Sequence, residues 1–381
     1  MLSSNTTSIP SHNHIYFRYQ SHSITFAEWI KLVTVCLAPL ITHVAFGYGT
    51  PVILSQRRPN LLDRLTQFNP ITIVWRYYAI VNRRIRAYDW DRIDMVTSNA
   101  IFWDGNRWDG SEQLMLQSRQ WVTKLPQQSR VDWLSSSMLA TVAMTAQGIG
   151  AVVLLVQSLG TDWTVASWGF PDIFNYLAVL SFSRLPASLW LSDEGGFEAM
   201  NRQTLASNEL TSESLDSWMY STAPAAYCPL KTNARMELSE PNTFHDFQRP
   251  IFRSRLRPST AFAARLWAVC CILGWIGGLV IGIYASTVCL GPRPFLIITQ
   301  LSTLCISLYY LTLFLCAGII IICYILKDHA GNTVLPCMNT TWYKWLNVVM
   351  ILLALLMFIT SALEMTILPN GKITTYTIPP L

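Results

Sequence analysis

Charged residues are scarce in this sequence. Asp, Glu, Lys and Arg make up 13% of the 381 residues, whereas apolar residues make up 51% and the mean hydropathy is +0.32. Soluble domains carry roughly 25% charged residues. The composition therefore excludes an ordinary soluble domain and indicates that the lipid bilayer is the main solvent and partner of the chain.

The sequence also lacks the patterns of a disulfide framework, a zinc site or a repeat protein. It has nine cysteines but no Cys-x-x-Cys pair, and most of them lie in apolar stretches, where they act as small hydrophobic side chains. There is no internal repeat and no heptad pattern. The favoured fold class is all-α, a polytopic integral membrane helix bundle.

Long apolar stretches predict about six transmembrane helices, because a span needs roughly 20 mostly apolar residues. One stretch is weaker than the others, since Arg184 and Pro186 interrupt it. An alternative interpretation of the first stretch is a cleaved signal peptide, which the long polar segment before it disfavours. The predicted spans are 30–48, 137–159, 172–192, 266–288, 297–326 and 346–367.

The placement of positive charge predicts which linkers face the cytosol. The linker 49–136 carries twelve Lys and Arg residues and the linker 193–265 carries eight. Cytosolic loops are enriched in these residues, so both linkers are expected on that side. They can share a side only if 172–192 also crosses the membrane. The loop 327–345 then lies on the cytosolic side as well.

Both termini, 1–29 and 368–381, are then predicted to be lumenal or extracellular polar tails. Asn5 begins an Asn-Thr-Thr acceptor sequence in the first tail, so it is expected to carry a glycan. Asn339 begins a second such sequence in the cytosolic loop and is expected to stay unmodified. The compartment is the endoplasmic reticulum, another endomembrane or the plasma membrane.

Residues 193–265 are rich in Ser, Asn, Glu and Pro without helical periodicity, so most of this linker is predicted to be disordered. Four arginines precede the next span. They are interpreted as a topology signal, with docking to anionic lipid head groups as the alternative. These are Arg249, Arg253, Arg255 and Arg257.

Gly274, Gly278 and Gly282 follow one another at four-residue steps in the fourth predicted span. They share one helix face and would allow a second helix to approach closely. We expect packing within the chain, with a seam to another copy or to other membrane proteins as the alternative.

Ionisable residues inside predicted spans are candidates for function, because charges are unfavourable in hydrocarbon. Arg184, His43 and Glu364 are such residues. Glu364 is expected near the lumenal interface, and Arg184 is expected to reach toward the interface or to bind backbone carbonyls. Binding of an anionic substrate by Arg184 would make the protein a small-molecule carrier, which is one alternative function.

The segment 69–93 predicts an amphipathic helix that begins at Asn69-Pro70. Ile71, Trp75, Tyr78 and Ile85 recur on one face, and four arginines lie off that face. Such a helix is expected to lie on the anionic cytosolic leaflet, and lipid is preferred over nucleic acid as its partner. The arginines are Arg76, Arg83, Arg84 and Arg86.

Asp89, Asp91 and Asp94 follow this helix in the sequence "DWDRID". Clustered carboxylates can hold Mg²⁺ against a diphosphate, so the alternative enzyme hypothesis is a membrane transferase or cyclase acting on a lipophilic diphosphate. A second aspartate-rich motif, as helical prenyl-transferring enzymes require, is missing. We therefore expect no catalytic residue and no resident cofactor or metal.

The sequence "FWDGNRWDGSE" contains Trp-Asp-Gly twice. Asp104 is predicted to begin a turn, and Asp109 with Glu112 forms the pattern of a capping box before a helix. Trp103 and Trp108 would then anchor a hairpin in the linker 49–136, which is rich in Trp and Arg and is expected to form a folded cytosolic loop domain. The favoured interpretation of the motif is structural.

The stretch "NPITIVWRYYAIVNRRIRAYDWDRIDMVTSNAIFWDGNRWDGSE", together with "GNTVLPCMNTTWYKW", resembles a set of multi-pass membrane proteins of filamentous fungi. Some of these are encoded beside secondary-metabolite genes. The resemblance covers most of the chain and implies no activity, cofactor or catalytic residue. The expected function is a non-catalytic accessory, scaffold or transport-related role, in which the resemblance suggests a fungal secondary-metabolite pathway.

Overall fold

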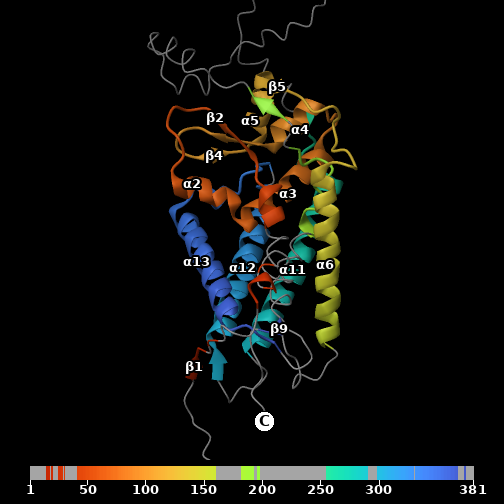
Figure 1. Ribbon diagram of the computed structural model, residues 1–381. Helices are drawn as coiled ribbons and strands as arrows, with labels where there is room; N and C mark the ends of the chain where they lie inside the picture. Colours follow the sequence, from red (N-terminus) through yellow and green to blue (C-terminus); the bar gives the residue numbers. More distant parts are fainter. Residues whose placement is uncertain are drawn as a thin grey trace, which may run out of the picture.

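The computed structural model describes residues 14–17, 19, 25–28, 30, 41–159, 182–192, 195–197, 255–290, 298–329, 331–367 and 373–374. Long helices extend in one direction from a group of shorter elements (Figure 1). We call residues 49–135, which form most of that group, the cap domain. The long helices are α6 (Ser136–Leu159), α11 (Phe262–Leu290), α12 (Leu301–Leu326) and α13 (Thr341–Leu363).

Three helices in the described residues are long and apolar enough to cross a membrane, namely Phe262–Val280, Leu304–Leu326 and Thr341–Leu363. The structure thus indicates an integral membrane protein with three candidate spans rather than the predicted six. Helix α6 covers the predicted span 137–159. Residues 31–40, in the first part of the first predicted span, lie outside the described residues.

The prediction that a helix continues to residue 192 is wrong. Residues 182–190 form successive short turns, with backbone bonds from Ala187 to Arg184 and from Trp190 to Ala187. Pro186 cannot donate a helical hydrogen bond, and the Arg184 side chain is held by groups outside its own segment. Residues 171–181 are not described.

The last span begins and ends earlier than predicted, because α13 starts at Thr341 instead of 346 and ends at Leu363 instead of 367. Its first turn contains Trp342, Tyr343 and Lys344, which hydropathy alone does not count as membrane residues. Lys344 forms an ion pair with Asp63 of the cap domain at 2.5 Å. The helix therefore continues beyond the apolar stretch into polar contacts.

The cap domain contains small sheets, so the all-α prediction is corrected to a mostly helical fold. Strand β2 pairs in parallel with β3, and β3 pairs antiparallel with β4. Elsewhere in the described chain β1 pairs with β7, β5 with β6 and β8 with β9. The bounds are β1 His14–Tyr16, β2 Thr50–Ile53, α2 Leu61–Leu65, η1 Thr66–Phe68, α4 Arg92–Asn99, β3 Ala100–Trp103, β4 Trp108–Asp109, α5 Glu112–Gln117, η2 Ser118–Trp121, β5 Val122–Lys124, β6 Gly196–Phe197, β7 Ile298–Gln300, η4 Pro336–Asn339, β8 Thr366–Ile367 and β9 Ile373–Thr374.

Helix α3 (Pro70–Arg86) lies at the junction of the cap domain and the long helices (Figure 1). It begins as predicted, because Pro70 occupies its first turn and the Asn69 side chain accepts a hydrogen bond from the Ile71 amide at 2.9 Å. Its side chains are buried on every face. The prediction that this helix lies on the lipid surface is therefore wrong.

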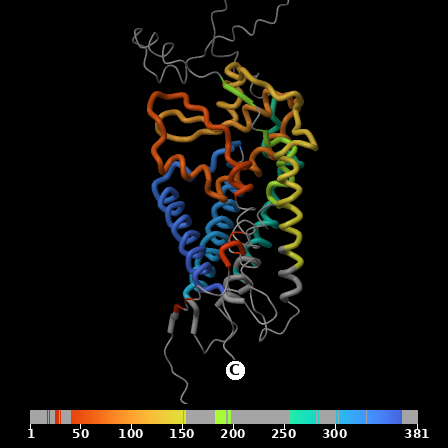
Figure 2. Tube along the Cα trace, viewed as in Figure 1, coloured from red at the N-terminus to blue at the C-terminus, as the bar shows by residue number. Residues whose placement is uncertain are grey.

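One hydrophobic core runs from the cap domain into the long helices. Trp75 of α3 and Trp108 of β4 belong to the same buried cluster as Tyr310 and Phe314 of α12 and Leu335. Figure 2 shows the segment after α12, in blue, reaching up among the orange elements of the cap domain. The cap domain and the long helices therefore form a single folded body.

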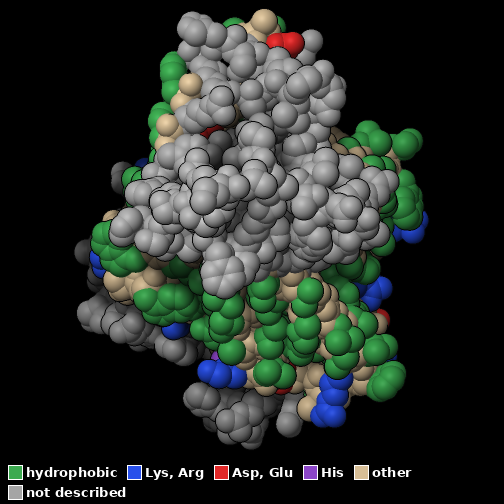
Figure 3. Space-filling view, turned by 90° about the horizontal axis from the view of Figure 1, so that it is seen from below, with side chains coloured by type: hydrophobic (Ala, Val, Ile, Leu, Met, Phe, Trp, Pro, Cys, Tyr) green, Lys and Arg blue, Asp and Glu red, His purple; other side chains and the backbone are tan. Residues whose placement is uncertain are grey.

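The outer faces of the long helices are apolar. Hydrophobic side chains dominate the described surface seen from below, and Lys and Arg lie near its edges (Figure 3). Exposed residues on these helices include Leu273, Val280, Ile319, Leu352 and Leu355. Exposed apolar surface of this extent suits contact with lipid rather than water.

Candidate functional site

Arg76 points from α3 into the protein. Its guanidinium donates to the carbonyl oxygen of Gly47 at 2.5 Å, and to the carbonyl and side-chain oxygens of Asn99 at 3.0 and 2.7 Å. The side chain is 5% exposed. It therefore ties the end of the first predicted span to the end of α4.

Arg83 and Arg86 also point inward. Arg83 donates to the carbonyl oxygens of Gly110 and Gly331, which joins the cap domain to the segment before α13. Arg86 forms an ion pair with Glu112 at 2.5 Å. Three of the four arginines that the sequence placed on a lipid surface instead bind oxygens of backbone, amide and carboxylate groups inside the fold. The fourth, Arg84, is partly buried, with its guanidinium over the rings of Trp90 and Trp190.

Burial lowers the pKa of both Arg76 and Arg83 to about 10, and for Arg76 the nearby charge of Arg184 acts in the same direction. A guanidinium with that pKa is still protonated at neutral pH. The hydrogen bonds found for these two side chains in the described part of the chain go to neutral oxygens. The junction beneath the cap domain therefore holds buried positive charge.

Arg184 is fully buried near the start of α6, beside this junction. It donates to the hydroxyls of Thr141 at 2.8 Å, Ser137 at 2.8 Å and Tyr77 at 3.2 Å. The ring of Tyr77 in turn meets the buried His43 edge to face at 5.4 Å. Each nitrogen of the guanidinium thus has a hydroxyl partner, so the expectation that Arg184 reaches to the interface or to backbone carbonyls is wrong.

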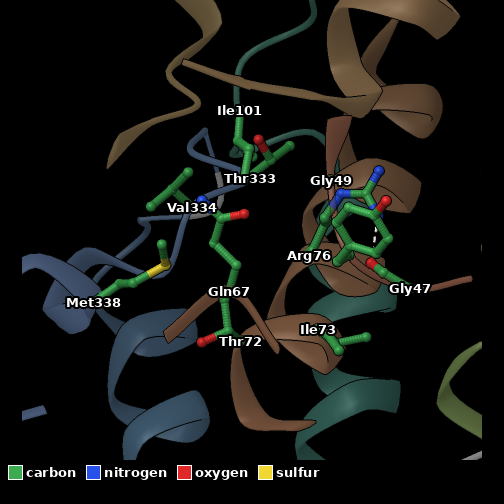
Figure 4. A pocket seen from close by; sticks show the side chains of 11 residues that line it. Gly47, Gly49, Gln67, Thr72, Ile73, Arg76, Ile101, Thr333, Val334 and Met338 are labelled. Carbon is green, nitrogen blue, oxygen red and sulfur yellow. Dashed lines mark hydrogen bonds between the residues drawn. The ribbon is translucent and has the colours of Figure 1, made fainter. Parts of the chain in front are cut away.

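A small cavity lies beside Arg76 (Figure 4). In Figure 4 the Gln67 side chain stands at its centre, with Met338 and Val334 on one side and Arg76 on the other. The free space is about 10 Å³ and is partly open to the exterior. The lining residues are Gly47, Tyr48, Gly49, Gln67, Thr72, Ile73, Arg76, Ile101, Thr333, Val334 and Met338.

Two hydrogen-bond donors at this cavity lack an acceptor within the described residues, namely Nε of Arg76 and Nε2 of Gln67. Both side chains are 5% exposed. Leaving a buried donor unpaired costs about 1–3 kcal/mol. The cavity therefore lies beside two buried donors that have no acceptor within the described residues.

The structure brings together only two of the three predicted aspartates, and both form ion pairs with arginines. Asp91 and Asp94 both pair with Arg119, and both pair with Arg255, at 2.9 and 2.6 Å respectively. Asp89 lies on the exposed surface nearby. Among the described residues no group of three or more His, Cys, Asp or Glu side chains could hold a metal ion. Two cations already neutralise these carboxylates, which argues against a Mg²⁺ site here.

The lowered pKa of Asp91 predicts that the folded protein loses stability in acid. Partial burial acts to raise its pKa, but hydrogen bonds from Arg119 and from the Asp94 amide, together with the charges of Arg119 and Arg255, lower it to about 2. Its stabilising effect is present above its ordinary pKa of 3.8 and is lost as the pH falls toward 2. We expect the melting temperature of wild type to fall more steeply between pH 4 and pH 2 than that of Asp91→Asn. Equal slopes would contradict the lowered pKa.

The two Trp-Asp-Gly sequences form a hairpin, as predicted. Asp104 Oδ1 accepts hydrogen bonds from the Asn106 and Arg107 amides at 2.8 Å, and Gly105 has φ of 107°, a conformation suited to glycine. Trp103 and Trp108 are cross-strand partners with ring centroids 5.0 Å apart. Both rings are buried, so the motif anchors the cap domain.

The helix after this hairpin starts two residues later than predicted. Ser111, and not Asp109, is the N-cap of α5, and its hydroxyl accepts a hydrogen bond from the Leu114 amide. Asp109 instead accepts from the Ser111 amide at 2.8 Å. Glu112 is free to pair with Arg86 because it does not close a capping box.

The predicted glycine face of α11 is only partly in contact with another helix. A Cβ added at Gly278 would lie 3.9 Å from the Phe314 ring of α12, whereas one added at Gly274 would meet no neighbour within 4 Å in the described structure. The side-chain surroundings of Gly282 are not described. The close approach between these helices is at Gly318 of α12, against Leu279.

The side chain of Asn339 forms a pair of hydrogen bonds with the Trp108 backbone, at 2.8 Å to the amide and 2.9 Å to the carbonyl. Glu364, at the far end of α13, is buried and accepts a hydrogen bond from the Ser302 amide in the first turn of α12 at 3.0 Å. Asn5, Arg249 and Arg253 lie outside the described residues.

Sequence reasoning missed the cavity and its donors. Gln67 lies in a short helix with no motif, and Gly47 and Gly49 lie where the first predicted span ends. The available signal was "GYG" at 47–49, since two glycines flanking a tyrosine permit close backbone approach. This signal does not indicate which side chains approach.

These features define a class of protein: an α-helical membrane protein with a polar cap domain fused to one end of its long helices. No family model matches the chain, and no similar curated protein or solved structure was found.

Proposed function

We propose that the protein is a non-catalytic membrane scaffold or accessory component whose cap domain is held rigidly at one membrane face. The observation that carries this proposal is the set of hydrogen bonds between the cap domain and the segment 331–347. Asn69 donates to Asn347 at 2.9 Å, and Thr72 bonds to Tyr343 at 2.8 Å. Such connections favour a fixed surface over a domain that opens and closes.

The side chains that were candidates for catalysis or substrate binding support the same proposal. The carboxylates of Asp91 and Asp94 are paired with arginines, and the guanidinium nitrogens of Arg184 are paired with hydroxyls. An enzyme or a carrier would need such groups available to substrate. The resemblance to fungal membrane proteins suggests a secondary-metabolite pathway, with anionic head groups and other membrane proteins as partners.

The proposal places the cap domain in the cytosol and the N-terminal tail on the opposite side of the membrane. We therefore expect a glycosidase-sensitive mass shift that disappears in Asn5→Gln and is unchanged in Asn339→Gln. The fold supports the second half of this prediction, since the Asn339 amide is already bonded to Trp108. A shift that survives in Asn5→Gln and vanishes in Asn339→Gln would reverse the orientation.

The proposed function is tested by deleting the gene in the source organism and measuring the effect by untargeted metabolite profiling. A scaffold predicts either a general decrease of a pathway or no change, and not the build-up of one precursor. Accumulation of a single defined precursor that wild type clears, but that Asp91→Asn at normal abundance does not, would replace the scaffold with the enzyme hypothesis.

A further inference from the structure

Helix α2 and the short helix η1, residues 61–68, bury polar side chains and expose apolar ones. The buried polar side chains are Asp63, Thr66 and Gln67. Three large apolar side chains are exposed, namely Leu61, Leu62 and Phe68. A helical segment that borders water has the opposite pattern, with its apolar side chains facing the core. The exposed face of residues 61–68 therefore suits an apolar environment outside the protein.

Residues 61–68 are fixed to the end of α13 that meets the cap domain. Figure 1 shows α2 at this end of the helix. Asp63 of α2 pairs with Lys344 at 2.5 Å, and Asn69, directly after η1, donates to Asn347 at 2.9 Å. The exposed apolar face therefore lies level with the first two turns of α13.

Helix α13 shows where the bilayer boundary lies. Its exposed apolar side chains recur at spacings of three and four along one face, and the first two are tryptophans, which favour the membrane interface. At 1.5 Å per residue its 23 residues extend roughly 34 Å, close to the hydrocarbon thickness of about 30 Å. The first turns of α13, and residues 61–68 beside them, therefore lie at the boundary. The exposed stripe includes Trp342, Trp345, Val349, Leu352, Leu356 and Ile359.

Positive charge lies on the same exposed face. Arg64 is exposed, three residues after Leu61 and four before Phe68, and residues at these spacings are neighbours on one side of a helix. Arg64 belongs to none of the ion pairs found among the described residues. A guanidinium beside apolar side chains at a membrane boundary can reach the head groups and bind a phosphate through two hydrogen bonds. The face thus combines apolar and cationic groups in the arrangement that an anionic phospholipid matches.

We propose that residues 61–68 insert Leu61, Leu62 and Phe68 into the boundary layer of the bilayer beside α13, and that Arg64 binds the phosphate of an anionic phospholipid there. This contact holds the cap domain at a fixed depth in one leaflet. It replaces the lipid contact that the sequence predicted for α3. The contact forms whether or not the protein acts as a scaffold.

The test uses Phe68→benzoylphenylalanine, a photoreactive substitution, in the full-length protein. The protein is reconstituted in vesicles that contain equal amounts of phosphatidylcholine and phosphatidylserine. Illumination links the side chain to the molecule that it touches, and mass spectrometry identifies the adduct. We expect a phospholipid adduct. The absence of a lipid adduct, or a link to a second copy of the chain in its place, would overturn the inference.

Leu125→benzoylphenylalanine is the matched control. Leu125 is 40% exposed, against 41% for Phe68, and it directly follows β5, which lies at the end of the cap domain away from the long helices (Figure 1). We expect little phospholipid adduct there, and equal amounts at both positions would overturn the inference. If the Phe68 variant does not fold, Leu61→benzoylphenylalanine repeats the measurement on the same face.

A second substitution in the photoreactive protein tests the role of Arg64. One arginine at an anionic surface should favour phosphatidylserine over phosphatidylcholine among the adducts by about fivefold. We expect Arg64→Gln to remove most of this preference, whereas Lys124→Gln, which removes an exposed cation of β5, should keep it. An equal preference with and without Arg64 would overturn the assignment of the head group to this arginine.

Discussion

Gly47→Ala is expected to destabilise the protein by about 3 kcal/mol, the upper end for overpacking a core. A Cβ at this position would come within 3.0 Å of the His43 carbonyl oxygen, the Tyr77 hydroxyl and the Ile73 side chain. The first of these is backbone and cannot rotate away. The measurement is thermal or denaturant unfolding of the full-length protein in micelles.

The same substitution should also disturb the buried arginines. The Gly47 carbonyl accepts from Arg76, and the Tyr77 hydroxyl accepts from Arg184. Gly277→Ala provides the control, because a Cβ at Gly277 meets no atom of the described structure within 4 Å. Alanine is favoured over glycine within a helix by roughly 0.5–1 kcal/mol. Equal stability of the two variants would contradict the described packing around Gly47.

Asp94→Asn is expected to lower the free energy of unfolding by about 3 kcal/mol. The substitution removes one of the two carboxylates that pair with the same two arginines. The Asp94 side chain is 3% exposed, while those of Arg119 and Arg255 are 22% and 31% exposed. Its Oδ2 also accepts a hydrogen bond from the Asp91 amide at 3.2 Å. The loss should appear as a lower unfolding midpoint and as lower abundance in cells.

Asp89→Asn is the matched control for this change. Asp89 is exposed and belongs to none of the ion pairs in the Asp91, Asp94, Arg119 and Arg255 cluster. Substitutions at such positions usually change stability by less than about 0.5 kcal/mol. If Asp94→Asn were as stable as Asp89→Asn, the cluster would not be structural, and a functional role of its carboxylates would have to be considered again.

Local sequence signals predicted the local structure well. The Asn69-Pro70 start of α3 and the Asp104 turn were found where their residue types require them, because both depend on neighbours only a few positions away. The predicted spans 266–288 and 297–326 correspond to α11 and α12, since apolar length alone determines a candidate span. Their starts differ, because α11 begins at Phe262 and residues 298–300 form strand β7 before α12 begins at Leu301.

Local sequence patterns failed to predict the features that depend on contacts between distant segments. Periodicity identified the apolar face of α3 but not what covers its opposite face, so Arg76 and Arg83 were assigned to lipid when they bind the carbonyls of other segments. Charge spacing likewise grouped Asp91 with Asp94, but could not reveal that Arg255, from a distant part of the sequence, pairs with both. The cavity at Gln67 depends on four segments meeting, and no local pattern indicates that.

The most direct test of a structural role for the carboxylates compares function with abundance in a deletion strain. The strain is complemented with wild type, Asp89→Asn, Asp91→Asn and Asp94→Asn, and pathway output is measured beside the amount of protein in the membrane fraction. We predict that pathway output is proportional to protein abundance, with the same proportionality for all four proteins. Asp94→Asn should be lowest in both measurements. A variant with wild-type abundance and no output would contradict a purely structural role and show that the carboxylates act in chemistry.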